Sequence, residues 1–182
     1  MGAGDGRFVF EAARSNSDTL FVAVDPVADQ MAVAARKAVR QRLANVLFVQ
    51  AAVGRLPPEL DGLADRITIN FPWGSLLKAL AVPDAALLSA IARLGRPGAA
   101  LTALINVSVF DDAAYCARQG LPCPPVFADG ETTRWTYGQS GLDVTRIVQD
   151  AEVLPVRTTW GRKLTRGTRR RVLQLEAGIG SR

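Results

Sequence analysis

Strand-like apolar segments alternate with helix-like segments along most of this chain, and this alternation restricts the possible folds more than any other feature. Residues 19–24 (Thr-Leu-Phe-Val-Ala-Val) are almost continuously apolar, which is typical of a parallel strand covered on both faces. Further strands are expected at 46–49, 66–71, 100–107, 142–148 and 172–175, and helices at 7–14, after Pro26, at 75–80 and at 83–94. The pattern predicts an α/β fold in which helices cover both faces of a doubly wound sheet.

Length and composition favour one domain over residues 1–182, with an irregular insertion at about 110–133. The sequence has neither a run of about 18 apolar residues nor a secretion signal, so we expect a cytoplasmic protein without a membrane partner. Cys116 and Cys123 are expected to be free thiols, and we expect no metal site and a monomer. Histidine is absent, which excludes catalytic triads and acid–base chemistry that depend on imidazole.

Basic residues are concentrated in two segments of a chain whose net charge is +5. The segment 157–171 holds seven arginines and lysines and no acidic residue, and the segment 36–42 holds Arg36, Lys37, Arg40 and Arg42. Each segment could be a solvated surface or a surface that binds nucleic acid.

A glycine-rich loop, Gly2-Ala3-Gly4-Asp5-Gly6, precedes the first helix. Its glycines allow a sharp turn and a close approach of the backbone to a ligand, although a plain turn can have the same composition. The strand at 19–24 leads into Asp25, whose carboxylate could accept hydrogen bonds from both ribose hydroxyls of an adenosine. Loop and acid together indicate a nucleoside cofactor, and the Gly-x-Gly-x-Gly spacing favours S-adenosylmethionine (SAM) over NAD.

Two tryptophans lie in segments that suit the binding of a base. The segment Asn70-Phe71-Pro72-Trp73 places a ring at the carboxyl end of a strand, where it could stack on a base or pack on the next helix. Trp160 lies beside Arg162 and Lys163, as expected for a stacking residue next to cations that bind phosphate. The third tryptophan, Trp135, is expected to be structural. Ligands bind beyond the carboxyl ends of the strands in such sheets. We therefore expect four segments to converge on one site: the glycine loop, Asp25, Gln50-Ala51-Ala52 and residues 70–73.

These segments resemble the aminoglycoside-resistance methyltransferases of the kanamycin–apramycin type, which modify N1 of a decoding-site adenine in 16S ribosomal RNA. The resemblance covers nearly the whole chain and is carried by residues 2–9 (GAGDGRFV), Asp25, Ala51-Ala52, residues 71–77 (FPWGSLL) and residues 158–162 (TTWGR). It implies a Rossmann-like class I methyltransferase that uses SAM, acts on 16S rRNA within the 30S subunit and confers aminoglycoside resistance.

The resemblance also implies roles for single residues. Trp73 and Trp160 would sandwich the flipped adenine. The contacts with SAM would be made by Gly2, Gly4, Phe8, Asp25, Ala52, Val53, Asn70, Phe71, Pro72, Trp73, Ser75 and Thr158. The contacts with RNA would be made by Arg36, Lys37, Arg40, Arg162, Lys163, Arg166 and Arg169.

The chain departs from the family pattern at two places. Members carry a strand that ends in an acidic residue before the glycine loop, whereas this chain begins at Met1-Gly2, so we expect the first strand of the sheet to be missing. Members usually have an acidic residue shortly after the Ala-Ala pair, where this chain has Val53-Gly54.

Two further functions fit the same residues. The segment 70–73 also resembles the Asn-Pro-Pro-aromatic motif of N6-adenine methyltransferases, and the chain could be a catalytically weak or inactive RNA-binding domain. N1 methylation is favoured because the segment around Trp160 supplies a second stacking residue. Its chemistry also suits a protein without histidine, since the N1 lone pair can attack the methyl group once the base is flipped out and aligned.

Overall fold

The computed structural model of the chain describes residues 1–149 and 171–180, which belong to two compact units. Of the described residues, 1–52 belong to unit 1, and 53–149 and 171–180 belong to unit 2. Each unit is described by itself below. The expectation of one domain over residues 1–182 stays a prediction.

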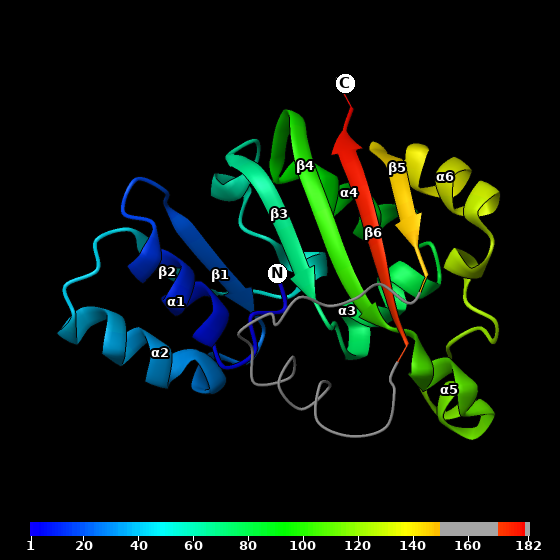
Figure 1. Ribbon diagram of the computed structural model, residues 1–182, viewed down its shortest axis with the longest axis horizontal. Coiled ribbons are helices and arrows are strands. Elements are labelled where there is room, and N and C mark those ends of the chain that lie inside the picture. The colour runs from blue at the N-terminus through cyan, green and yellow to red at the C-terminus, as the bar shows by residue number, and fades with distance from the viewer. Residues whose placement is uncertain (150–170, 181–182) are drawn as a thin grey trace. The chain divides into compact units, whose positions relative to one another are not determined.

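In unit 1, two helices pack against a pair of parallel strands (Figure 1). The elements are α1 (Arg7–Ser15), β1 (Phe21–Asp25), α2 (Ala28–Arg40) and β2 (Val46–Gln50). The core of this unit forms where Phe10 of α1 meets Ala34 and Ala38 of α2, with Phe48 of β2 packed against them. The parallel register sets Asp25 opposite Gln50, so the carboxyl ends of both strands lie at one edge.

Unit 2 is built on a four-stranded sheet in the order β3-β4-β6-β5 (Figure 1). Its strands are β3 (Ala64–Asn70), β4 (Gly95–Asn106), β5 (Leu142–Val148) and β6 (Val172–Ile179). Its helices are α3 (Gly74–Ala81), α4 (Ala85–Arg93), α5 (Ala113–Gln119) and α6 (Gly130–Gly138), with short 3-10 turns at Val53–Arg55, Pro58–Leu60, Val107–Asp111 and Val126–Ala128. Strand β3 runs parallel to β4, and β6 runs antiparallel to both β4 and β5.

The core of unit 2 is apolar and holds one buried phenol. Ile69 of β3, Leu101 of β4 and Leu175 of β6 are fully buried, as expected for strands whose apolar side chains form the core. Tyr137 of α6 is fully buried as well, and its hydroxyl donates a hydrogen bond of 2.7 Å to the carbonyl oxygen of Leu80. This bond joins α6 to the last turn of α3.

The structure corrects two expectations from the sequence. The segment at 110–133 is not irregular, since it contains α5 and the start of α6. Trp135 is not a core residue, because 69% of it is exposed on α6.

Within the described residues, no single helix is long and apolar enough to cross a membrane, and only α3 and α4 together, which meet at 106°, reach that length and composition. The described residues also contain no cluster of three or more cysteines, aspartates and glutamates that could hold a metal ion. Cys116 and Cys123 are free thiols, as the sequence predicts.

Candidate functional site

The glycine loop of unit 1 is a tight turn whose glycines all have left-handed backbone angles. The φ angles of Gly2, Gly4 and Gly6 are 65°, 54° and 68°. Residues other than glycine rarely adopt such positive φ angles. Gly6 is also packed closely, because a Cβ atom there would lie 2.9 Å from Cε1 of Phe48. A Cβ on Gly4 would meet no described atom within 4 Å, so the backbone of Gly4 borders open space that a ligand can approach.

Asp25 ties this loop to the start of α2. Its carboxylate accepts hydrogen bonds from the backbone N–H groups of Gly4, at 2.8 Å, and of Val27, at 2.9 Å. Asp25 lies at the carboxyl end of β1 and is only 8% exposed. Because a carboxylate offers about four acceptor positions, the two backbone bonds leave capacity for ribose hydroxyls. The residues present therefore fit an adenosine next to the loop.

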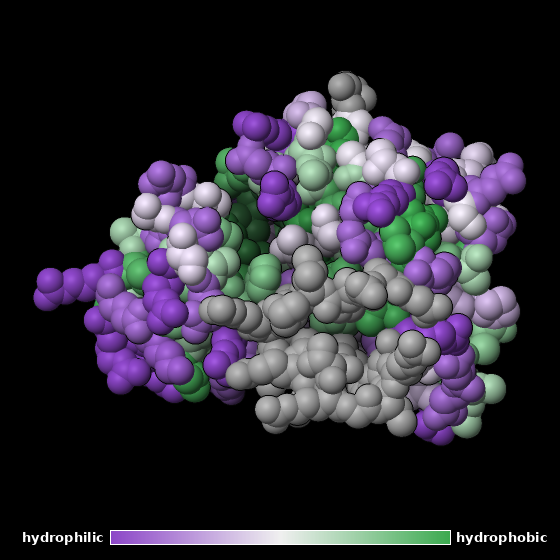
Figure 2. Space-filling model, in the orientation of Figure 1, coloured by the Kyte–Doolittle hydropathy of each residue, from purple (hydrophilic) through white to green (hydrophobic). Residues whose placement is uncertain are grey.

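The remaining residues of unit 1 with expected roles lie around this edge and along α2. The N–H of Ala51 donates to the carbonyl oxygen of Asp25 at 3.1 Å, which brings the Ala51-Ala52 pair to the end of β1. Arg36, Lys37 and Arg40 are all exposed on α2, and Figure 2 shows a mainly hydrophilic surface over α1 and α2.

In unit 2, the segment after β3 has an unusual backbone that presents Trp73. Phe71 is buried with a φ angle of 53°, and its N–H donates to the carbonyl oxygen of Leu104 at 2.7 Å. Gly74 has a φ angle of 56° and begins α3, for which Trp73 is the N-cap residue. Two left-handed residues thus flank the Pro72-Trp73 pair and turn the chain from strand to helix.

Trp73 is 39% exposed, and one of its ring contacts is with Tyr115 of α5. The two ring centroids lie 6.2 Å apart with perpendicular planes, an edge-to-face arrangement. Two contacts fix the backbone of α5 at Tyr115. Asp112 caps the helix by accepting the N–H of Tyr115 at 2.9 Å, and the neighbouring Cys116 is buried.

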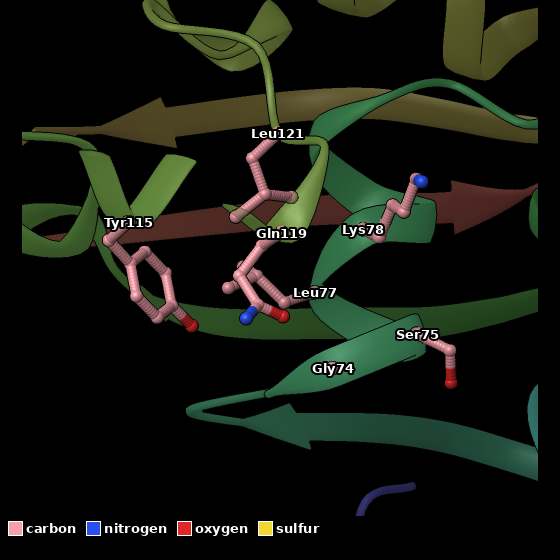
Figure 3. A pocket seen from close by; sticks show the side chains of 7 residues that line it. All are labelled: Gly74, Ser75, Leu77, Lys78, Tyr115, Gln119 and Leu121. Carbon is pink, nitrogen blue, oxygen red and sulfur yellow. The ribbon is translucent and has the colours of Figure 1, made fainter. Parts of the chain in front are cut away.

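Tyr115 also lines a hollow of about 280 Å³ (Figure 3). Gly74, Ser75, Leu77 and Lys78 of α3 line one side, and Tyr115, Gln119 and Leu121 line the other. Sequence reasoning missed Lys78, Tyr115 and Gln119. A signal was present in the caps of α5, Asp112 at its start and Gly120 at its end, which mark a short helix inside the expected insertion.

Several residues with expected roles lie outside the described part of the chain. They are Thr158, Trp160, Arg162, Lys163, Arg166 and Arg169, and with them most of the basic segment 157–171. Of the cofactor residues expected in unit 2, Asn70 is half-buried and Ser75 exposed, while Val53, Phe71 and Pro72 are buried. Because the side chains of these last three have little exposed surface, we expect a contact with a ligand to use mainly their backbone atoms.

Comparison with known proteins identifies the family. Residues 1–179 match the family model described as NpmA, 16S rRNA (adenine(1408)-N(1))-methyltransferase. The chain belongs to this family. An Escherichia coli protein of that description is 28% identical over 186 residues, covering 98% of this chain and 85% of the relative. A second, from Streptoalloteichus hindustanus, is 30% identical over 171 residues, covering 90% of this chain and 78% of the relative.

Solved structures of family members share the fold. The antibiotic-resistance methyltransferase Kmr is 40% identical with a TM-score of 0.80, covering all of this chain and 85% of its own. The aminoglycoside-resistance methyltransferase NpmB1 is 36% identical with a TM-score of 0.84, covering 98% and 84%. A W203A mutant of the Catenulisporales acidiphilia enzyme, solved with the cosubstrate SAM, is 25% identical with a TM-score of 0.86, covering 99% and 84%.

Proposed function

We propose that this chain transfers the methyl group of SAM to N1 of adenine 1408 in 16S rRNA. The observation that carries the proposal is the family match, which extends from residue 1 to residue 179 and thus includes both tryptophan segments. The solved relatives described as resistance enzymes support a role in protection against aminoglycosides.

The reaction makes modest chemical demands on the protein. SAM supplies a methyl group on a positively charged sulfur that leaves as a neutral thioether. The N1 lone pair forms the new bond to carbon as the bond from carbon to sulfur breaks, and the positive charge passes to the adenine. Because N1 has no proton to lose, no general base is needed, and a chain without histidine can promote the step by aligning the two reactants.

Cofactor binding is proposed to depend on the glycine loop and Asp25. The Asp25 carboxylate would accept the ribose hydroxyls while the Gly4 N–H and the Val27 N–H hold it in place. The open space at Gly4 would admit the cofactor close to the backbone. The other proposed contacts with SAM are Gly2, Phe8, Ala52, Val53, Asn70, Phe71, Pro72, Trp73, Ser75 and Thr158.

Recognition of the target is proposed to depend on stacking and on cations. The exposed indole of Trp73 would stack on one face of the flipped adenine and Trp160 on the other, with each such contact contributing about 1–3 kcal/mol. Arg36, Lys37 and Arg40, exposed along α2, would bind phosphates together with Arg162, Lys163, Arg166 and Arg169.

The finer setting of the reaction is also a proposal. We propose that the chain acts as a monomer in the cytoplasm and that its substrate is the assembled 30S subunit rather than free 16S rRNA. Faster methyl incorporation into 30S subunits than into naked 16S rRNA would support this setting. Equal rates on the two substrates would contradict the proposal that the assembled 30S subunit is the preferred substrate.

Methyl transfer to purified 30S subunits tests the proposed function. The subunits are incubated with the chain and labelled SAM, and the 16S rRNA is then copied by primer extension. A methyl group on N1 blocks base pairing, so a stop at adenine 1408 is expected. Incorporation of label without a stop would indicate N6 methylation instead. Binding to 30S subunits without incorporation would indicate an inactive RNA-binding domain.

A further inference from the structure

The hollow between α3 and α5 has the polarity of a site for a backbone unit of nucleic acid. Its floor includes Leu77 and Leu121, which are buried, and its rim carries the amine of Lys78, the amide of Gln119 and the phenol of Tyr115 (Figure 3). All three rim groups can donate hydrogen bonds. A volume of about 280 Å³ is at the lower limit for ligand pockets, so it suits a small unit rather than a whole dinucleotide.

The charge around the hollow favours an anion. Its lining contains no aspartate or glutamate. Helix α5 has no acidic residue, and the two aspartates just before it are already engaged, since Asp112 caps the helix at Tyr115 and Asp111 pairs with Arg171. Lys78, by contrast, is exposed and makes no ion pair with any acidic residue in 1–149 or 171–180.

The protonation of Tyr115 and the position of the Lys78 amine both suit the donation of hydrogen bonds to a ligand in the hollow. Burial raises the pKa of the Tyr115 hydroxyl above its usual value, so the group stays protonated and can donate at neutral pH. The amine of Lys78 lies over the end of α5, because a Cβ atom on Gly120 would be 3.2 Å from its Nζ. The amine thus lies close to Gly120, which follows Gln119 directly in the chain.

The hollow also adjoins the proposed stacking residue. Gly74 follows Trp73 directly, and Tyr115 touches the ring of Trp73 while it lines the hollow. A base stacked on Trp73 carries its ribose and phosphates with it, so the RNA backbone must pass within one nucleotide of this ring.

We infer that this hollow binds the ribose-phosphate unit adjoining the nucleotide stacked on Trp73, with Lys78 and Gln119 holding the phosphate. The inference rests on the proposed function and adds a contact made by residues that belong to neither basic segment of the sequence. The apolar floor would receive the ribose face, and the rim would bind the phosphate oxygens.

The dependence of 30S binding on salt tests the inference. The affinity of the full chain for 30S subunits is measured between about 50 and 200 mM salt, and the logarithm of the association constant is plotted against the logarithm of the salt concentration. A Lys78→Met variant keeps the apolar stem but loses one cation. Its slope is expected to be shallower by roughly one unit, which is the signature of one lost phosphate contact.

Three further variants make the result specific. Lys78→Arg keeps the cation and is expected to keep the parent's slope. Gln119→Leu removes a neutral donor and is expected to weaken binding at every salt concentration without changing the slope. Arg134→Met is the matched control, because it removes one exposed cation from α6, which does not line the hollow. Melting temperatures of all variants report on folding.

Equal slopes and affinities for Lys78→Met and Arg134→Met would overturn the inference. So would a Lys78→Arg variant that binds as weakly as Lys78→Met. Methylation of adenine 1408 by the parent chain, measured on the same preparations, separates this failure from a failure of the proposed function. If the parent methylates while the Lys78 variants bind normally, only the hollow is excluded.

Discussion

The edge of one ring meets the face of the other where Trp73 and Tyr115 come together, with centroids 6.2 Å apart and planes at 90°. Trp73 is the N-cap residue of α3, and Tyr115 lies on α5, more than 40 residues later in the sequence. Trp73 is partly exposed, so fewer neighbours fix the orientation of its ring than would do so in the core. The contact with Tyr115 therefore restricts the orientations that this ring can adopt.

Replacement of Tyr115 should separate this positioning role from its hydroxyl. Tyr115→Phe keeps the ring, so the kcat for methylation at saturating 30S is expected to stay near the parent's while KM rises. Tyr115→Leu removes the ring contact, which is worth about 0.5–1.5 kcal/mol, so kcat should fall by a factor of about two to ten. Steady-state methylation assays measure both constants. Equal kcat values for the two variants would contradict the positioning role.

Replacement of Trp73 tests stacking on the target base. Trp73→Ala should lower kcat/KM for 30S subunits by a factor of roughly 5–150, which corresponds to the loss of about 1–3 kcal/mol of stacking. Trp73→Phe keeps a ring and should retain a larger share of the activity. Single-turnover methylation gives the comparison, and an alanine variant as fast as the parent would exclude Trp73 from base recognition.

Asp25→Asn should affect both the fold and the binding of SAM. In the parent, both oxygens of the carboxylate accept backbone N–H groups, whereas the amide of asparagine directs a donor at one of them. A buried donor without a partner costs about 1–3 kcal/mol, so the free energy of unfolding is expected to fall by that amount. Chemical denaturation measures this change, and calorimetric titration is expected to show weaker binding of SAM.

Asp29→Asn is the matched control for Asp25→Asn, because Asp29 is an exposed acidic residue in the first turn of α2. Its stability and its affinity for SAM should match those of the parent. The same loss at Asp29 and at Asp25 would mean that net charge, rather than the buried hydrogen bonds, causes the effect.

Alanine substitutions at Gly4 and Gly6 should differ in their effects on stability and on SAM binding, although both residues have left-handed φ angles. At Gly6 the new Cβ would collide with Phe48 and Ala34, and overpacking of this kind costs about 1–3 kcal/mol in addition to the backbone strain. At Gly4 there is room for the Cβ, so the loss of stability should be smaller while the binding of SAM suffers. Thermal unfolding ranks the two variants, and a Gly4→Ala variant that is less stable than Gly6→Ala would contradict this packing.

Tyr137→Phe should loosen α3, because it leaves the carbonyl oxygen of Leu80 buried without its donor. The expected cost is about 1–3 kcal/mol of unfolding free energy. Burial also raises the pKa of the Tyr137 hydroxyl in the folded state, so the parent should lose stability as the pH rises above the unfolded value of 10.0. The phenylalanine variant lacks this contribution, and its stability should change less over that pH range. An identical alkaline dependence in both proteins would show that Tyr137 does not titrate on unfolding.

The elements that sequence analysis predicts best are those with strong periodic patterns. The strands around Val22, Phe48, Ile69 and Leu101 and the helices between them lie within a few residues of their expected positions, since long apolar runs have few alternatives. The placement of Asp25 at a strand end also follows from its position after such a run.

The rest depends on contacts that no local pattern records. The left-handed conformation of Phe71 is held by a hydrogen bond to Leu104, a residue on another strand. Helix α5 has only seven residues, too few for a clear apolar period, so proline-rich sequence around it suggested an irregular segment. The hollow escapes prediction because its two walls, around Lys78 and around Gln119, come together only in the folded chain.

The most direct test of the central claim compares 30S subunits that carry adenine at position 1408 with subunits that carry guanine there. In guanine, N1 holds a proton and has no lone pair in the ring plane, so it cannot attack the methyl group of SAM. We predict about one methyl group per adenine-1408 subunit, mapped to N1, and none in guanine-1408 subunits. Equal incorporation into both, or no incorporation into either while the chain still binds SAM, would contradict the proposed function.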